Sequence, residues 1–267
     1  MTEDDSALFR QWLEQAGWAR ESVGPLGELV ALGDSTVALP NQLWSDPVLA
    51  TGVAERVASA MRLDVREVVQ RLVSPLTDRI EFRLIGDDLG NGRIPLGAAS
   101  EALKNGRRLI SASGTSAIAP AWSVARRYRP EAQLLAREAE LAHTEDGSFV
   151  FPLYITLQRP ERPALPLTQG NDTTVTIEPY ERRVTRTLAT ALASAVNLTD
   201  RSVEQLSDDD LDTASTVGVT RELCSSLDEM LKNPSVDQVA ISFDWSPAFG
   251  TTTSLPTTVA LPRSMRP

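Results

Sequence analysis

The chain contains one histidine, His143, and one cysteine, Cys224, among its 267 residues. These residue types most often act as general base, thiol nucleophile or transition-metal ligand. A Ser-His-Asp or Cys-His arrangement could be built only around His143, and a Cys/His zinc site lacks enough ligands within one chain. We interpret His143 as an exposed residue beside a turn and Cys224, within an apolar helical pattern, as a small core residue. The sequence therefore argues against the common catalytic classes.

Arginines are concentrated in the middle of the chain, near Trp122 and Tyr128. Arginine beside aromatic side chains can hold a phosphate or stack on a base. The alternative, which we favour, is that these arginines form ion pairs with Asp and Glu side chains, which are in excess in the flanking segments, or with those of a partner subunit. The candidate binding residues are Arg107, Arg108, Arg126, Arg127 and Arg129.

Carboxylates offer a second kind of chemistry, a Mg2+ site of the nuclease type. Glu138 and Glu140 are expected on one face of a strand, and Asp87-Asp88 are expected to follow another strand. Alternating charge on a solvent-facing strand explains the same residues. The acidic run 208–212 lacks the spacing of an EF-hand and is interpreted as a helical first turn capped by Ser207. We therefore expect no metal ion and no cofactor.

Charge and composition exclude further classes. The formal net charge is -10, whereas a nucleic-acid binder usually presents a basic face, so the balance argues against a nucleic-acid partner. Only Lys104 and Lys232 are lysines, which leaves little room for a phosphate-loop or Schiff-base lysine. No apolar stretch approaches the ~18 residues of a membrane span. The acidic N-terminus without a following apolar segment and the single cysteine predict a cytoplasmic protein.

The first 75 residues predict a small α+β subdomain. Apolar residues at helical spacing over 5–17 indicate an amphipathic helix. Two short apolar runs, 29–32 and 36–40, indicate a hairpin. The segment 46–73 predicts two helices that are separated near Leu63-Asp64.

Residues 78–247 predict the main domain, and 248–267 form a Thr/Pro-rich tail without periodicity. Alternating apolar and charged residues over 80–86 indicate a strand, followed by a helix to about residue 113. The segment 133–157 predicts a hairpin, with its second strand, 149–157, at the edge of a sheet or at a bulge because Pro152 cannot donate to a strand ladder. The elements expected further along are a loop at 158–173, helices at 178–196, 202–206, 208–216 and 220–231, and a strand at 236–245. The fold class is α+β: a helix–hairpin–helix unit, then a mainly antiparallel sheet packed with helices.

Several short blocks of the sequence, taken together, carry a resemblance to other proteins. They are residues 9–18 (FRQWLEQAGW), 80–86 with Ile94-Pro95-Leu96, 146–150 (DGSFV), 218–224 (GVTRELC) and 242–247 (SFDWSP). Together they resemble a group of bacterial proteins of unknown activity that is common in actinobacteria. No activity and no site residue follows from this resemblance.

The leading hypothesis is a non-enzymatic, cytoplasmic interaction protein that acts through a protein partner or by self-association. It rests on the lack of a catalytic constellation, on the expected edge strand at 149–157 and on the acidic surface. A place in a bacterial stress or anti-phage system is a further hypothesis. The alternative is a protein that acts on a nucleotide or nucleic acid, with the arginine-rich segment and a Mg2+ held by carboxylates, so enzymatic activity stays open.

Overall fold

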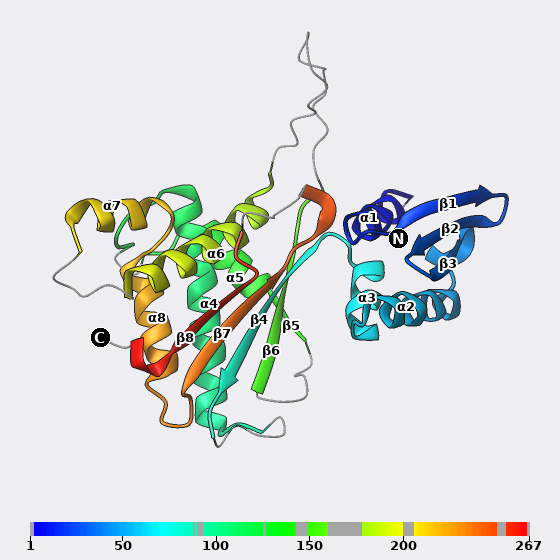
Figure 1. Ribbon diagram of the computed structural model, residues 1–267. Coiled ribbons are helices and arrows are strands. Elements are labelled where there is room, and N and C mark those ends of the chain that lie inside the picture. Colours follow the sequence, from blue (N-terminus) through cyan, green and yellow to red (C-terminus); the bar gives the residue numbers. More distant parts are fainter. Residues whose placement is uncertain are drawn as a thin grey trace, which may run out of the picture. The chain divides into compact units, whose positions relative to one another are not determined.

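The computed structural model describes residues 3–87, 89, 93–124, 127–142, 149–159, 178–199, 206–249 and 255–265. The chain forms two compact units. Unit 1 comprises Met1–Thr77 with Ser246–Thr251, and unit 2 comprises Asp78–Trp245 with Thr252–Pro267 (Figure 1). His143, Arg126, the expected loop at 158–173 and the expected helix at 202–206 lie outside the described residues, apart from residues 158, 159 and 206.

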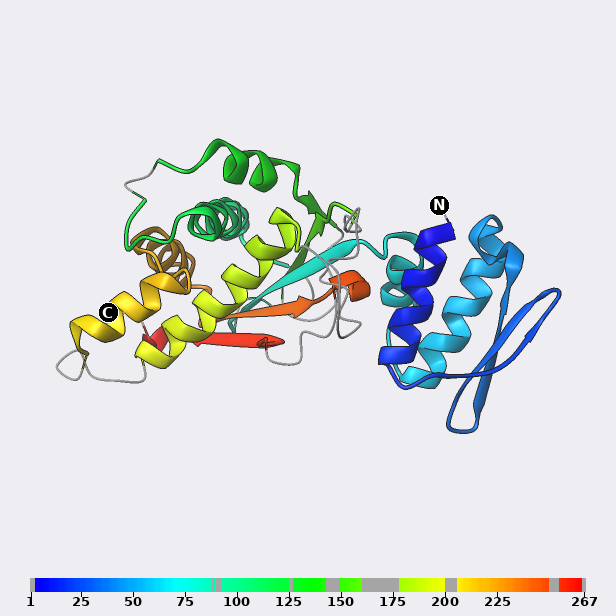
Figure 2. The same cartoon turned by 90° about the horizontal axis from the view of Figure 1, so that it is seen from above.

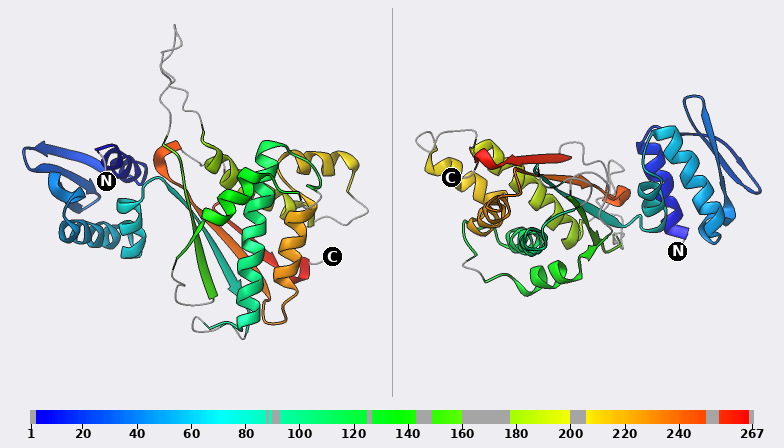
Figure 3. Two further views of the ribbon diagram at one scale, coloured as in Figure 1. Left: turned by 180° about the vertical axis from the view of Figure 1, so that it is seen from behind. Right: turned by 90° about the horizontal axis from the view of Figure 1, so that it is seen from below.

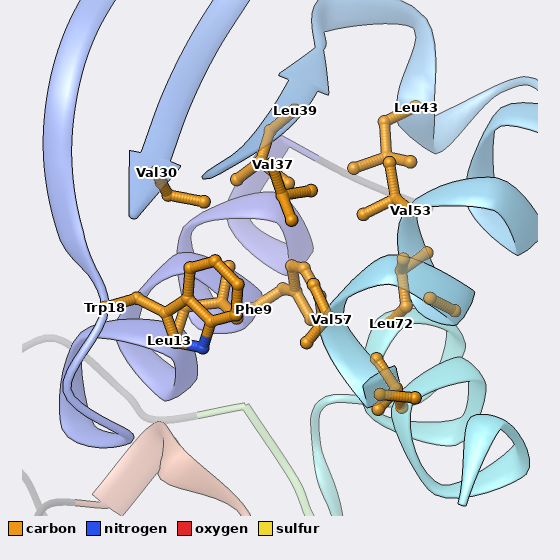
Figure 4. Packing of buried hydrophobic residues seen from close by; sticks show 13 residues of the cluster. Phe9, Leu13, Trp18, Val30, Val37, Leu39, Leu43, Val53, Val57 and Leu72 are labelled. Carbon is orange, nitrogen blue, oxygen red and sulfur yellow. The ribbon is translucent and has the colours of Figure 1, made fainter. Parts of the chain in front are cut away.

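Unit 1 is a three-stranded antiparallel sheet in the order β1-β2-β3, with helices packed on one of its faces (Figure 2). The helices and the sheet enclose an apolar core that includes Phe9, Leu13, Val37 and Val57 (Figure 4). The elements are α1 (Glu3–Gln15), β1 (Ala19–Gly24), β2 (Gly27–Leu32), β3 (Ser35–Pro40), the 3-10 helix η1 (Asn41–Trp44), α2 (Pro47–Met61) and α3 (Val65–Val73).

Short-range signals place the two later helices of unit 1. The Asp46 carboxylate accepts from the backbone N–H of Val48 at 2.9 Å and so caps α2. Arg62, in the left-handed conformation with φ 58°, ends α2. Asp64 then caps α3 by accepting from the N–H of Arg66 at 2.7 Å, which confirms the predicted break between the helices.

The first strand of unit 1 was not predicted. All six residues of β1 are exposed, so the strand has no apolar alternation to reveal it. It forms because the tight turn at 24–27 brings it alongside β2, with a bulge between Arg20 and Ser22. Near the end of the chain, a 3-10 helix, η3 (Pro247–Phe249), also belongs to unit 1, where it packs against α1.

Unit 2 is a five-stranded sheet in the order β5-β6-β4-β7-β8, with its helices gathered on one face (Figure 3). Its strands are β4 (Thr77–Ile85), β5 (Glu140–Leu141), β6 (Phe149–Thr156), β7 (Gln238–Asp244) and β8 (Thr258–Pro262). Its helices are α4 (Leu96–Ile118), α5 (Pro130–Glu138), α6 (Tyr180–Thr199), α7 (Asp208–Thr216) and α8 (Arg221–Leu231), and a 3-10 helix, η4 (Arg263–Met265), follows β8. The antiparallel pairs β4–β7, β5–β6 and β7–β8 confirm the α+β class.

Aromatic packing joins the sheet of unit 2 to its helical layer. Phe82 of β4 and Phe151 of β6 are fully buried and stack with ring centroids 4.9 Å apart. Gly106 lies in the middle of α4, and a Cβ there would contact the Phe151 ring at 3.5 Å. The glycine that weakens the helical pattern thus lies where α4 passes closely over the sheet.

The strand predicted over 135–143 is wrong, since most of this segment belongs to helix α5. Pro130 starts the helix, and Ala132, Leu135 and Ala136 are buried together at three- and four-residue spacing. The alternation of leucine and alanine with charged residues also fits a short helix because alanine is compatible with either environment. Of the described residues of this segment, Glu140 and Leu141 alone pair as a strand.

Two other expectations about the sheet are corrected. The strand at 149–157 is not at the edge, because β6 lies between β5 and β4; β5 pairs only with Leu153 and Tyr154. The Thr/Pro-rich tail also contributes an element, since Thr258–Pro262 form β8 beside β7. Its alternation is only five residues long, with Val259 and Leu261 buried. Among the described residues, no helix has the length and apolar character needed to cross a membrane.

Candidate functional site

The predicted arginines do not all meet in one site. Arg107 and Arg108 are exposed on α4, and Arg127 and Arg129 are exposed in the connection before α5. Within the described part of the chain, none of these four forms an ion pair, so the pairing favoured from the sequence is not made there. Pairing with a partner subunit stays a prediction. Of these four arginines, Arg108 lines a pocket of unit 2 to which the other three do not contribute.

That pocket, which we call the α4–α8 pocket, has a volume of about 740 Å3. Its lining comes from α4, from the connection between α4 and α5, and from α8, and it is mostly polar. The lining residues are Lys104, Arg108, Ser123, Tyr128, Arg221, Glu222, Ser225, Ser226 and Glu229. Because α4 and α8 are more than a hundred residues apart in the chain, sequence reasoning did not connect Arg221 with Arg108. It also missed Lys104, which lies one helical turn before Arg108 on α4.

The N-terminal end of α8 fixes one wall of the pocket. The Thr220 hydroxyl is buried and accepts from the N–H of Leu223 at 3.0 Å, which caps the helix. In the first turn, the Glu222 carboxylate accepts from the Ser123 hydroxyl at 3.0 Å and from the Val124 N–H at 3.1 Å. The backbone N–H of Arg221 donates to the Trp122 carbonyl at 2.8 Å. These contacts hold the α4–α5 connection against α8.

Both carboxylates of the pocket are already engaged. Glu222 accepts the two hydrogen bonds from residues 123 and 124. Glu229 is 2.7 Å from the Lys232 ammonium, whose hydrogen bond lowers the pKa of the Glu229 carboxyl. Their negative charges are therefore partly satisfied within the protein.

The cationic groups of the pocket are less fully paired. The Lys104 ammonium lies 3.4 Å from Glu101, and Arg108 Nη1 donates to the Asn105 amide oxygen at 3.2 Å. Within the described residues, the Arg221 side chain has no ion-pair partner. The pocket thus combines two guanidinium groups, an ammonium and several hydroxyls, a set that suits an anionic ligand.

The carboxylates proposed for Mg2+ do not form a site in the described residues. No group of three or more His, Cys, Asp or Glu side chains able to hold a metal converges there. Asp87 and Glu138 do not line the α4–α8 pocket. The acidic run after Ser207 forms the first turn of helix α7 with Ser207 as its N-cap, as predicted, and Ser207 and Asp210 in addition form a capping box.

Cys224 is exposed on α8, so its assignment to the core is wrong. The buried stripe of α8 instead runs through Leu223, Ser226, Leu227 and Met230, and position 224 lies beside it. With His143 outside the described residues, the structure adds no nucleophile–base pair around either residue.

A second surface feature lies in unit 1, on the face of the sheet opposite the core. The strand registers Ser22–Leu29–Ala38 and Ala19–Ala31–Thr36 place these residues side by side, with Leu29 38% exposed at the centre. We call these six residues the open face. The six residues are themselves uncharged. Arg20 and Glu28, which pair with each other, lie in register with Val30 and Leu39 on the core side of the sheet, and Glu21 is exposed at the bulge of β1 next to Ser22.

Comparison of the chain with family models, with curated proteins and with solved structures gave no match. No functional residue is therefore carried over from a relative, and the resemblance to actinobacterial proteins stays a prediction. The two features that bear on function are the α4–α8 pocket and the open face.

Proposed function

We propose that the chain is a non-enzymatic, cytoplasmic interaction protein that associates with a second copy of itself through the open face of unit 1. The uncharged character of this face carries the proposal. Elsewhere the chain is strongly acidic, with a formal net charge of -10, so two copies repel one another over most of their surfaces. On an uncharged sheet face that repulsion is small.

The geometry of the open face suits a symmetric contact. Two identical faces can meet about a twofold axis, so that each residue contacts its counterpart on the other copy. Small residues such as Ala31 and Ala38 flank Leu29, and sheets with small side chains can approach to about 10 Å. At the tip of the β1–β2 hairpin, Leu26 is a further apolar side chain, 86% exposed, whereas Val23 is in register with Glu28 and Leu39 on the core side of the sheet.

The expected dimer is weak. Three strands of six residues cover roughly 300 Å2, compared with about 800 Å2 per partner in a stable complex. Association should therefore depend on protein concentration, and it should also survive high salt because the contact is uncharged.

Sedimentation velocity on the purified chain over a wide concentration range tests the proposal. We expect a shift toward the dimer as concentration rises, and we expect Leu29→Asp to remain monomeric because it would place two carboxylates in the contact. Leu134→Asp is the matched control, since Leu134 is 44% exposed on α5 of unit 2. A wild-type protein that stays monomeric at every concentration, or equal loss of the dimer in both variants, contradicts the proposal.

A further inference from the structure

The α4–α8 pocket is independent of the open face and points to a second property of the chain. We propose that it binds a small anion that carries phosphate groups. Its volume of about 740 Å3 lies within the roughly 300–1,000 Å3 typical of pockets for small ligands.

The charge of the pocket favours an anion over a cation. Lys104, Arg108 and Arg221 contribute three positive charges, and Glu222 and Glu229 contribute two negative charges. Both carboxylates have hydrogen-bond donors from the protein, as described above. The donors still available to a ligand are thus mainly the guanidinium groups and the hydroxyl of Ser225.

Two arginines favour phosphate in particular. A planar guanidinium can donate two parallel hydrogen bonds to a phosphate, whereas an ammonium acts as a point charge. Arg108 comes from α4 and Arg221 from α8, so a ligand between them would be held from two sides. Ser225 follows Arg221 by one helical turn and provides a hydroxyl on the same wall.

A buried amide orients one of these arginines. Asn105 is fully buried, and its oxygen accepts from Arg108 Nη1 at 3.2 Å. Within the described residues its Nδ2 atom has no hydrogen-bond partner, so burial of this amide carries a cost that an apolar residue would avoid. The contact fixes one nitrogen of Arg108 and leaves its other nitrogens for a ligand.

The pocket suits a small molecule better than a nucleic-acid strand. A strand-binding surface follows the phosphate backbone with a continuous basic stripe. Here Arg107, Arg127 and Arg129 are exposed but do not line the pocket, and acidic residues lie among its basic ones. The positive groups converge on one hollow instead.

Isothermal titration calorimetry of the full chain with pyrophosphate, ADP and citrate tests the proposal. We expect saturable binding of pyrophosphate or ADP that weakens as salt rises. Each of Arg108→Gln and Arg221→Gln should weaken it roughly 10- to 100-fold, the effect expected for loss of hydrogen bonds to a charged group. Arg107→Gln and Arg129→Gln are matched controls, because they remove the same charge from exposed positions outside the pocket.

Three results would overturn the assignment. The first is no saturable binding of either phosphate probe, and the second is equal weakening in the pocket and control variants, which would indicate diffuse attraction. The third is tighter binding of citrate than of pyrophosphate and ADP, which would replace phosphate by carboxylate as the ligand class. Because all four arginines are exposed, circular dichroism should show the variants folded. Self-association is tested separately by sedimentation of the wild type and of Leu29→Asp, so the proposed dimer and the proposed anion site can fail independently of each other.

Discussion

The Nη2 atom of Arg182 lies 3.1 Å from Oδ1 of Asp78, and each side chain is 1% exposed. The Thr185 hydroxyl donates to the other carboxylate oxygen at 2.6 Å, and the guanidinium lies 5.2 Å from the centre of the Trp245 ring. Burial lowers the pKa of Arg182, and the charge of Asp78 opposes that shift. This buried pair joins the start of β4 to the first turn of α6 within unit 2.

Replacement of one partner should be much more harmful than replacement of both. Asp78→Ala leaves the Arg182 charge buried without its counterion, and we expect a loss of about 3–5 kcal/mol in the free energy of unfolding. The double variant Asp78→Leu with Arg182→Met should regain most of this loss. Urea denaturation followed by circular dichroism measures both effects.

An exposed ion pair on the same helix is the control for this prediction. Arg186 lies 2.8 Å from Glu178, but its side chain is 50% exposed. Arg186→Ala should therefore cost less than about 1 kcal/mol. If Asp78→Ala costs no more than Arg186→Ala, the buried pair does not contribute to stability in the way described.

Gly114 lies at a point where α4 packs closely against α5 and α6. A Cβ at this position would lie 2.8 Å from the Cβ of Ala132 and 2.8 Å from the hydroxyl of Tyr180. Gly114→Ala should destabilise the protein by about 1–3 kcal/mol, although alanine is the better helix former. The opposite sign is expected for Gly52→Ala in α2, where no atom lies within 4 Å, with a gain of about 0.5–1 kcal/mol. Thermal unfolding of the two variants should show shifts in opposite directions.

Tyr180 should make stability depend on pH in the alkaline range. Burial, assisted by the charge of Glu131, raises the pKa of its hydroxyl to about 12 from 10.0, and the hydroxyl donates to the Gly114 carbonyl at 3.0 Å. Between about pH 10 and 12 the unfolded chain releases this proton before the folded chain does, so the folded state loses stability as pH rises. The Tyr180→Phe variant should lack this component. An identical fall in unfolding free energy for wild type and variant would contradict the assignment.

The parts of the fold that were predicted correctly are those encoded by neighbouring residues. Asp46, Asp64, Ser207 and Thr220 each supply a capping oxygen within three residues of the N–H that they accept from. Because both partners of such a capping hydrogen bond lie within three residues of each other, the start of the helix can be predicted from the local sequence. The failures concern segments whose state is set by distant partners. β1 depends on β2 for its existence, and β8 has too short an alternation to stand out.

The α4–α8 pocket illustrates the same limit for sites. A search for clustered arginines found Arg108 because Arg107 stands next to it, but the exposed Arg107 does not line the pocket. Arg221 stands alone among its neighbours and reaches the pocket only because α8 packs beside α4. A capped helix start that carries a basic residue, as at Thr220-Arg221, is the one local signal that could have indicated it.

Ser246 provides a test of the contacts that keep the chain's late segment in unit 1. Its side chain is 1% exposed, and its hydroxyl donates to the carbonyl of Pro75, 171 residues away in the chain. The same hydroxyl oxygen accepts from the N–H of Ala248 at 3.3 Å, which positions η3. One side chain thus joins two segments of unit 1 that no local pattern connects.

Ser246→Ala would leave the buried Pro75 carbonyl without this donor, and we expect a loss of about 1–3 kcal/mol in the free energy of unfolding. Ser45→Ala removes a hydroxyl that donates to the Gln42 carbonyl at an exposed position of the same unit, where water can replace it. That control should change stability by less than about 0.5 kcal/mol. Because η3 packs on α1, amide hydrogen exchange in α1 should also become faster in Ser246→Ala and remain unchanged in Ser45→Ala. Unchanged exchange in both variants would mean that the segment is held in unit 1 by the packing of η3 alone.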